Sequence, residues 1–328
     1  MSQWLQQLPK YWRNRNAITY LLWPFEAVYK IVWSFRQWAI SQGLIKQHRV
    51  NATVIVVGNV VAGGGGKTPL TMAIVQRLVT QGFKVGVVSR GFGRAQASLK
   101  IVKADSLATE VGDEPLMIFQ KCHVPVVVGA QRVEAARHLL HQFPSVNVLV
   151  CDDGLQHIAL QRDIEICAMD ATGLGNGRLL PAGPLREPWP RPVDLLLHTH
   201  QRTLPEGFES RRELSSFAVA SQGKTLSVAE LKLKPVEVVS AIAQPDAFLA
   251  MLEQGQFQIR HSTALPDHDS FETWQPIHPE LPLLCTEKDA VKLWTRFPHA
   301  LALPLVFEPE VAFWEAFDQL FQSRHRYH

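Results

Sequence analysis

Four consecutive glycines precede a lysine and a threonine in the stretch VVAGGGGKTPL, residues 60–70. A glycine-rich backbone exposes N–H groups that can surround a phosphate, while lysine and threonine at this spacing supply a cation for phosphate oxygens and a hydroxyl for Mg²⁺. The strict nucleotide-binding pattern requires glycine five residues before Gly66, where this chain has Val61. The shorter form G-G-x-G-K-T keeps the parts that the chemistry needs. We therefore expect an ATP site formed by Gly63, Gly64, Gly65, Gly66, Lys67 and Thr68.

A second candidate group lies in VLVCDDGLQH, where an apolar run leads into Asp152 and Asp153. A carboxylate at the end of a strand next to a phosphate loop is suited to hold Mg²⁺. Aspartates also end strands simply as turn formers, and the pattern alone leaves that alternative open.

A third acidic group, VGDEP, places Asp113 and Glu114 ahead of an apolar segment. One carboxylate could accept a proton from an attacking hydroxyl while the other supports the metal. Acidic residues are equally favoured as the cap and first turn of a helix. The residues alone do not separate these two interpretations.

The surrounding sequence predicts how these groups are positioned. Apolar runs of strand length alternate with segments of helical periodicity, which favours a parallel α/β sheet covered by helices, with nucleotides bound at the carboxyl ends of the strands. The proline-rich stretch 177–192 is expected to be an ordered surface loop that binds a ligand. The expected strands are 53–57, 84–89, 124–130, 147–153, 164–170 and 193–198.

Periodicity weakens between 203 and 230, and a second set of strands follows. We therefore expect a P-loop domain over residues 1–222 and a smaller α/β domain over 223–328.

Composition argues against several other classes of protein. The net charge of +3 is too small to predict nucleic-acid binding, the four cysteines form no CxxC pair, and the thirteen histidines form no HExxH zinc motif.

The first 50 residues carry seven basic side chains and one acidic one, and five of the nine tryptophans. Within residues 17–40, Glu26, Lys30 and Arg36 interrupt the apolar run, so it is too short to span a membrane. Pro24 is expected to start or kink a helix there. We predict a membrane-associated amphipathic helix within about residues 1–45; the alternative is a helix packed on the protein's own core. Its predicted apolar stripe consists of Ile18, Leu21, Leu22, Phe25, Val28, Tyr29 and Val32.

Taken together, these residues resemble the tetraacyldisaccharide 4'-kinase family, the lipid A kinases of Gram-negative bacteria. The motifs occur in family order over most of the chain. They are VVGNVVAGGGGKTP (56–69), GVVSRGFGR (86–94), GDEP (112–115), DDGLQH (152–157), LLPAGPLRE (179–187), LPDHDSF (265–271) and TEKDAVK (286–292).

The resemblance implies a two-domain P-loop kinase that uses ATP and Mg²⁺ and is bound peripherally to the cytoplasmic face of the inner membrane. Its substrate would be a tetraacylated glucosamine disaccharide 1-phosphate, phosphorylated on the 4'-hydroxyl to give the bisphosphorylated lipid A precursor. Neither a nucleic-acid nor a protein partner is expected. The final helix, 309–322, is expected to return to the first domain because the linker is crossed twice.

The resemblance also implies roles for single residues. Asp113 resembles the family's catalytic base and His268 its partner, and because they fall in different expected domains, catalysis is expected to depend on domain closure. Thr68, Asp152 and Glu114 would hold magnesium. The acceptor site would be lined by Arg90, Phe92, Arg132, Asp153 and Gln156, with Phe92 standing where the family usually has tyrosine.

Two rival functions use the same phosphate loop. A membrane-associated ATPase switch characteristically has lysine before the paired glycines, where this chain has Ala62, and it has no use for the 265–271 motif. A kinase for a small soluble hydroxyl compound would tolerate loss of residues 1–40. A kinase for a lipid substrate would not.

Overall fold

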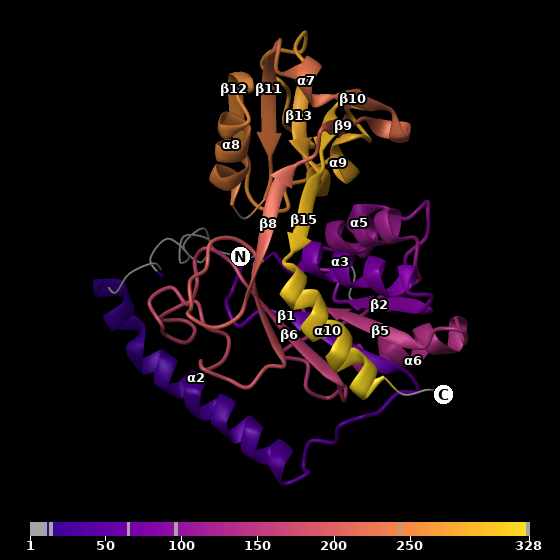
Figure 1. Ribbon diagram of the computed structural model, residues 1–328. Helices are drawn as coiled ribbons and strands as arrows, with labels where there is room; N and C mark the ends of the chain where they lie inside the picture. The colour runs from indigo at the N-terminus through magenta and orange to yellow at the C-terminus, as the bar shows by residue number, and fades with distance from the viewer. Residues whose placement is uncertain (1–11, 13–15, 64–65, 95–97, 243, 326–328) are drawn as a thin grey trace. The chain divides into compact units, whose positions relative to one another are not determined.

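The computed structural model describes residue 12 and residues 16–63, 66–94, 98–242 and 244–325 (Figure 1). The chain forms two compact units. The first comprises Met1–Arg90, Gln131–Ser210 and Pro309–His328, and the second comprises Gly91–Ala130 and Arg211–Glu308.

This division differs from the expected boundary at residue 222, mainly because residues 91–130 belong with the C-terminal part. The reason is a contact far apart in sequence, in which helix α5 (Asp113–Cys122) packs against helix α9 (Glu287–Leu293). Local periodicity carries no signal for such a contact.

The first unit contains a parallel sheet in the order β8-β7-β6-β1-β5-β2. This confirms the predicted α/β class, and five of the six expected strands lie here. The remaining predicted strand, β4 (Val126–Val128), pairs antiparallel with β3 (Lys100–Ile101) in the second unit. The bounds in the first sheet are β1 (Thr53–Gly58), β2 (Val85–Ser89), β5 (Val148–Asp152), β6 (Ile164–Met169), β7 (Leu195–His198) and β8 (Phe208–Leu214).

Both faces of this sheet are covered. All six residues of β1 and all five of β5 are buried, and because successive side chains point to opposite faces, such a strand has protein on both sides. Helix α3 (Lys67–Thr80) packs on β1, β2 and β5, and α6 (Arg132–Gln142) packs on β2. The C-terminal helix α10 (Val311–Arg324) belongs to this unit and packs on β6 and β7 (Figure 1).

Helix α2 (Ala17–Ser41) also belongs to the first unit. It begins at Ala17 after the N-cap Asn16, whose side chain accepts from the Thr19 N–H in a capping box. Pro24 therefore does not start the helix, and the alternative that it kinks the helix stays a prediction. Pro24 lies inside the helix, where it has no N–H to donate to the Tyr20 carbonyl. The capping box and the amphipathic pattern outweigh that lost hydrogen bond.

The second unit contains a sheet in the order β10-β9-β14-β13-β11-β12. Its central pairs β11–β12, β11–β13 and β13–β14 are parallel, and β9 is antiparallel to both of its neighbours. A buried cluster that includes Phe271, Cys285 and Leu293 packs α9 against this sheet. The other bounds are α4 (Ala108–Val111), β9 (Phe217–Val219), β10 (Thr225–Ser227), α7 (Val228–Leu231), β11 (Pro235–Ser240), α8 (Pro245–Gln254), β12 (Gln258–Ala264), β13 (Leu283–Thr286), β14 (Leu301–Leu303) and β15 (Leu305–Pro309), with a short 3-10 turn at Ser221–Gly223.

Candidate functional site

The glycine loop connects the end of β1 to the start of α3, as predicted. Gly63 has φ of +119° and Gly66 has φ of +70°, which is a backbone region that glycine enters without steric cost. Gly66 caps α3, and the helix begins at Lys67. The first-turn N–H groups of a helix have no intrahelical acceptors, so this end can bind an anion. The predicted Gly64 and Gly65 lie outside the described residues.

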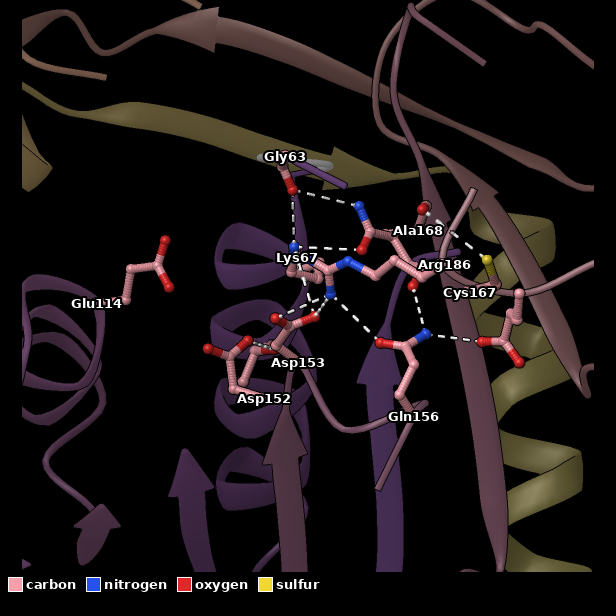
Figure 2. Close-up of polar contacts among 12 residues, drawn as sticks. Gly63, Lys67, Glu114, Asp152, Asp153, Gln156, Cys167, Ala168 and Arg186 are labelled. Carbon is pink, nitrogen blue, oxygen red and sulfur yellow. Dashed lines mark hydrogen bonds and ion pairs between the residues drawn. The ribbon is translucent and has the colours of Figure 1, made fainter. Parts of the chain in front are cut away.

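Lys67 is buried, and its ammonium lies over the loop (Figure 2). Its Nζ donates to the Gly63 carbonyl at 3.2 Å and to Asn59 Oδ1 at 3.4 Å, and it lies 3.6 Å from Asp153 Oδ1. All three neighbours are oxygens with negative or partial negative charge. The ammonium is therefore held where it can also attract the oxygens of a phosphate group in the loop.

Asp152 and Asp153 follow the predicted pattern at the end of β5 but face different partners. Asp152 is buried, and its Oδ1 accepts a hydrogen bond from Thr71 Oγ1 on α3 at 2.9 Å. Asp153 has φ of +49°, and its carboxylate accepts from Arg186 Nη1 at 2.9 and 3.2 Å. Burial alone would raise the pKa of Asp153, but Lys67 and Arg186 lower it below its usual value, so the group is ionised at neutral pH.

Thr68 and Asp152 have the chemistry that magnesium requires. Both are buried in the first unit and carry hard oxygen donors. Within the described part of the chain, no three His, Cys, Asp or Glu side chains form a metal-binding group. A magnesium site of the P-loop type does not need one, because Mg²⁺ there keeps several waters and takes one or two protein ligands plus phosphate oxygens. The residues present therefore fit this ion.

A hydrogen-bonded chain joins the strand-end loop to the proline-rich loop 177–192 (Figure 2). Gln156 Nε2 donates to Glu187 Oε1 at 2.7 Å and to the Asn59 carbonyl at 3.0 Å, while its Oε1 accepts from Arg186 Nη1 at 3.3 Å. We predicted a binding role for the loop but did not single out Arg186. Its sequence signals are a basic residue in a proline-rich loop and a place in the LLPAGPLRE motif (179–187).

The two predicted acceptor-site arginines in this unit have different environments. Arg90, after β2, is exposed. Arg132 is only 3% exposed, and its Nη2 points to the backbone carbonyls of Asp152 and Asp153 at 3.4 and 3.5 Å. Burial lowers the pKa of its guanidinium. Arg132 thus supports the turn that carries the two aspartates.

The predicted base and its partner are brought together in the second unit. Asp113 is the first residue of α5, and its Oδ2 lies 3.0 Å from His268 Nδ1. The same oxygen lies 2.9 Å from Nζ of Lys292, which we did not predict. Burial alone would raise the pKa of Asp113, but hydrogen bonds from His268 and Lys292 lower it below its usual value. The expectation that Asp113 and His268 lie in different domains is therefore wrong.

His268 is fixed by its own backbone and by its second ring nitrogen. It has φ of +65°, and its N–H donates to the Ala241 carbonyl at 3.0 Å. The Ala241 N–H donates in turn to the buried Asp289, which also accepts from Thr286 Oγ1. Lys288 Nζ lies 3.2 Å from His268 Nε2. Asp267 Oδ2 lies 3.7 Å from the same ring nitrogen.

The remaining predicted residues of this unit lie nearby. The exposed Phe92 ring packs against the His268 ring with centroids 5.1 Å apart. Glu114 Oε1 is 3.9 Å from Lys288 Nζ. The predicted site residues thus form one set in the first unit, around Lys67, and a second set in the second unit, around Asp113.

Helix α2 contacts the first set directly. Tyr29 donates from its hydroxyl to the Arg186 carbonyl at 2.7 Å, and Arg36 donates to the Gln156 carbonyl at 3.0 Å. Glu26 forms an ion pair with Arg178 at 3.1 Å. These contacts anchor one side of the helix to the loops that carry Asp153 and Arg186.

Another side of α2 is exposed and apolar. Of the predicted stripe, Leu22 is buried and Ile18 and Tyr29 are half-buried. Among the residues that the structure describes, no helix is both long enough and apolar enough to cross a membrane. The alternative of a helix packed on the protein's own core is confirmed for one side of α2, and membrane association stays a prediction. The exposed face comprises Leu21, Phe25, Val28, Val32 and Phe35.

A strand, a glycine loop with a lysine, and a strand-end aspartate beneath the same helix define a P-loop phosphate-binding α/β protein. Comparison with known proteins gives the family. The model of the tetraacyldisaccharide-1-P 4'-kinase family matches residues 18–325, so the chain belongs to that family.

Individual relatives agree with this assignment. The tetraacyldisaccharide 4'-kinase of Acidovorax sp. (strain JS42) is 47% identical over 94% of this chain and 92% of its own length. That of Polaromonas naphthalenivorans (strain CJ2) is 47% identical over 96% and 94%. A crystal structure of LpxK from Aquifex aeolicus in complex with ATP superposes with a TM-score of 0.82 at 28% identity, covering 94% of this chain and all of that one.

Proposed function

We propose that this protein is an ATP-dependent kinase that phosphorylates the 4'-hydroxyl of a tetraacylated glucosamine disaccharide 1-phosphate, giving the bisphosphorylated lipid A precursor. The observation that carries the phosphoryl-transfer chemistry is the Lys67 ammonium, held at the N-terminus of α3 beside Asp153. The substrate follows from membership of the family and from the relatives named tetraacyldisaccharide 4'-kinase.

On this proposal, Lys67 and the loop N–H groups bind the β- and γ-phosphates of ATP and neutralise charge as the γ-phosphoryl group is transferred. Thr68 and Asp152 would hold magnesium, and Glu114, which lies in the second unit, is proposed as a further ligand from the family resemblance alone. When bound, the ion supplies Lewis-acid stabilisation of the phosphate oxygens. The acceptor oxygen forms the new P–O bond, the bond between γ-phosphorus and the bridging oxygen breaks, and ADP leaves.

Asp113 accepts the proton of the 4'-hydroxyl. Its ionised carboxylate suits that role, and His268 orients it through Nδ1. Acceptor binding is assigned to Arg90, Phe92, Asp153 and Gln156. Because Arg132 is occupied with backbone carbonyls, its contribution is to position Asp153, and Arg186 joins the set.

We further propose that the protein is bound peripherally to the cytoplasmic face of the inner membrane through α2. The support is its exposed apolar face together with the basic side chains Lys30 and Arg36. Since Tyr29 and Arg36 also contact the loops of the first set, a helix lying in the lipid surface would hold those loops close to a lipid substrate.

The proposal is tested by transfer of ³²P from γ-labelled ATP to tetraacyldisaccharide 1-phosphate in detergent micelles. We expect labelled lipid with the unchanged protein and none with Lys67→Ala, whose fold is checked by its thermal melt. ATP hydrolysis without labelled lipid would instead support the ATPase switch.

A second variant tests the base. We expect Asp113→Asn to lose most of kcat while its affinity for ATP stays the same, because the carboxylate contacts the acceptor hydroxyl and not the nucleotide. Loss of ATP affinity with unchanged kcat would make Asp113 a metal or structural residue.

A further inference from the structure

A single polar side chain interrupts the apolar run that leads into the glycine loop. Asn59 follows β1 directly, and every other residue of 54–62 is valine, isoleucine, glycine or alanine. Asn59 is nevertheless only 2% exposed. A buried amide costs free energy unless its oxygen and its nitrogen both find hydrogen-bond partners. The partners of Asn59 therefore indicate what this side chain contributes.

The Asn59 side chain joins the P-loop lysine to the glycine loop. Its Oδ1 accepts from Lys67 Nζ at 3.4 Å, and its Nδ2 donates to the Gly63 carbonyl at 3.5 Å. Lys67 donates to the same carbonyl at 3.2 Å (Figure 2). Because lysine can only donate and a carbonyl can only accept, the two partners determine which end of the amide faces which. The bond to Gly63 thus keeps Oδ1 turned toward the ammonium.

A second acceptor competes for the same ammonium. Asp153 Oδ1 lies 3.6 Å from Lys67 Nζ, and its carboxylate is ionised at neutral pH. A carboxylate attracts an ammonium more strongly than an amide oxygen does. Without the Asn59 oxygen, the ammonium would be drawn toward Asp153, and less of its charge would act on a phosphate in the loop.

We propose that Asn59 is a positioning residue for ATP, which holds the Lys67 ammonium at the glycine loop and keeps it available to the β- and γ-phosphates. The inference rests on the proposed function for the use of ATP, and not for the identity of the acceptor. Asn59 does not itself touch the nucleotide. Its effect on ATP reaches the phosphates only through Lys67.

The chain provides a matched control in the same unit. Asn147 precedes β5 at the amino end of the sheet, whereas Asn59 follows β1 at the carboxyl end. Asn147 Oδ1 accepts from the Lys84 N–H at 3.0 Å, so Asn147→Ala also removes a side-chain amide that makes a hydrogen bond. The substitution leaves every contact of Lys67 intact. We expect Asn147→Ala to bind ATP with the affinity of the unchanged protein.

The test is a double-mutant cycle on the Kd for ATP, measured by isothermal titration calorimetry with Mg²⁺ and without lipid. The variants are Asn59→Ala, Lys67→Ala and the double variant. We expect Asn59→Ala to raise the Kd about tenfold, the size of one hydrogen bond to a charged group. In a protein that already carries Lys67→Ala, the same substitution should change the Kd by less than about twofold, because Asn59 acts through the ammonium.

A second variant keeps the inference testable if Asn59→Ala does not fold, which the thermal melt of the ATP-free protein shows. Asn59→Asp keeps the shape of the side chain and places a carboxylate beside the Lys67 ammonium. That carboxylate competes with phosphate for the positive charge, so we expect the Kd for ATP to rise by at least about tenfold.

Three outcomes would overturn the inference. If Asn59→Ala and Asn59→Asp both bind ATP with an unchanged Kd while Lys67→Ala does not, the ATP site stands and the role of Asn59 is wrong. If Asn59→Ala weakens binding equally with and without Lys67, or Asn147→Ala weakens it as much, Asn59 only stabilises the fold. If Lys67→Ala itself keeps the Kd of the unchanged protein, the proposed phosphate site is wrong, and the inference fails with it.

Discussion

The exposed apolar face of α2 allows a quantitative prediction for membrane binding. Leu21 is 73% exposed and Phe25 is 61% exposed, one turn apart on the same face. Burying a whole leucine or phenylalanine side chain is worth about 1.5–3 kcal/mol. Scaled by these exposed fractions, transfer of both side chains into a lipid surface contributes about 3 kcal/mol, which corresponds to about 100-fold in a partition coefficient.

We therefore expect the double variant Leu21→Gln/Phe25→Gln to bind anionic lipid vesicles about 100-fold more weakly than the unchanged protein in a flotation assay. The matched control is Val311→Gln, which changes an apolar residue that is 72% exposed on α10 in the same unit. The control should bind normally, and both variants should keep their KM for ATP. Equal vesicle binding by the double variant and the control would refute the assignment of this face to the membrane.

Three further predictions concern the sites and the core. Thr71→Val removes the donor to Asp152 Oδ1, so the free energy of unfolding, measured by urea denaturation, should fall by about 1–3 kcal/mol. The control Thr80→Val removes a hydroxyl bonded to a carbonyl on the exposed side of α3 and should change the free energy of unfolding little. Equal effects of the two substitutions would argue against a special role for the Thr71 contact. Asp289→Ala removes the acceptor of the Ala241 N–H, and the carbonyl of the same residue accepts the His268 N–H. We expect kcat to fall with the KM for ATP unchanged, because His268 loses this support. An unaltered kcat would show that His268 does not depend on it. Burial raises the pKa of Cys151 to about 11, so the thiol of the unfolded chain ionises first, near its usual pKa of about 8.5. The stability that this thiol contributes below that pH should be lost as pH rises towards 11. Cys151→Ala should reduce the slope of the free energy of unfolding against pH by up to one proton in this range, and an unchanged slope would contradict the burial of this thiol.

The first unit illustrates what the sequence specifies locally. The apolar run 53–57, the glycine-rich turn and the helical periodicity after Lys67 each carry a local sequence signal, and the structure has the strand, the turn and the helix. The parallel direction of these strands was also predicted, because alternating strands and helices favour parallel neighbours, whereas the order of the strands was not predicted. Asp152 lies at the end of β5, where the apolar run predicted it.

The parts that escaped prediction depend on contacts between distant residues. The contact of α5 with α9, which places Asp113 in the same unit as His268, has no local signature. Lys292 was visible only as one lysine in the TEKDAVK motif, and its partner is 179 residues earlier in the chain by residue number. The expected helix start at Pro24 was wrong for the opposite reason, since the local preference of proline for a first turn was outweighed by the capping box at Asn16.

The central claim is that the γ-phosphoryl group of ATP goes to one particular hydroxyl of a lipid disaccharide. The most direct measurement is ³¹P–¹H correlation NMR on the lipid recovered after incubation with ATP, Mg²⁺ and tetraacyldisaccharide 1-phosphate. We predict one new phosphomonoester whose phosphorus couples to the proton on the 4' carbon, with the 1-phosphate signal unchanged. A new diphosphate at position 1, a phosphate on another hydroxyl, or inorganic phosphate with unmodified lipid would contradict the account.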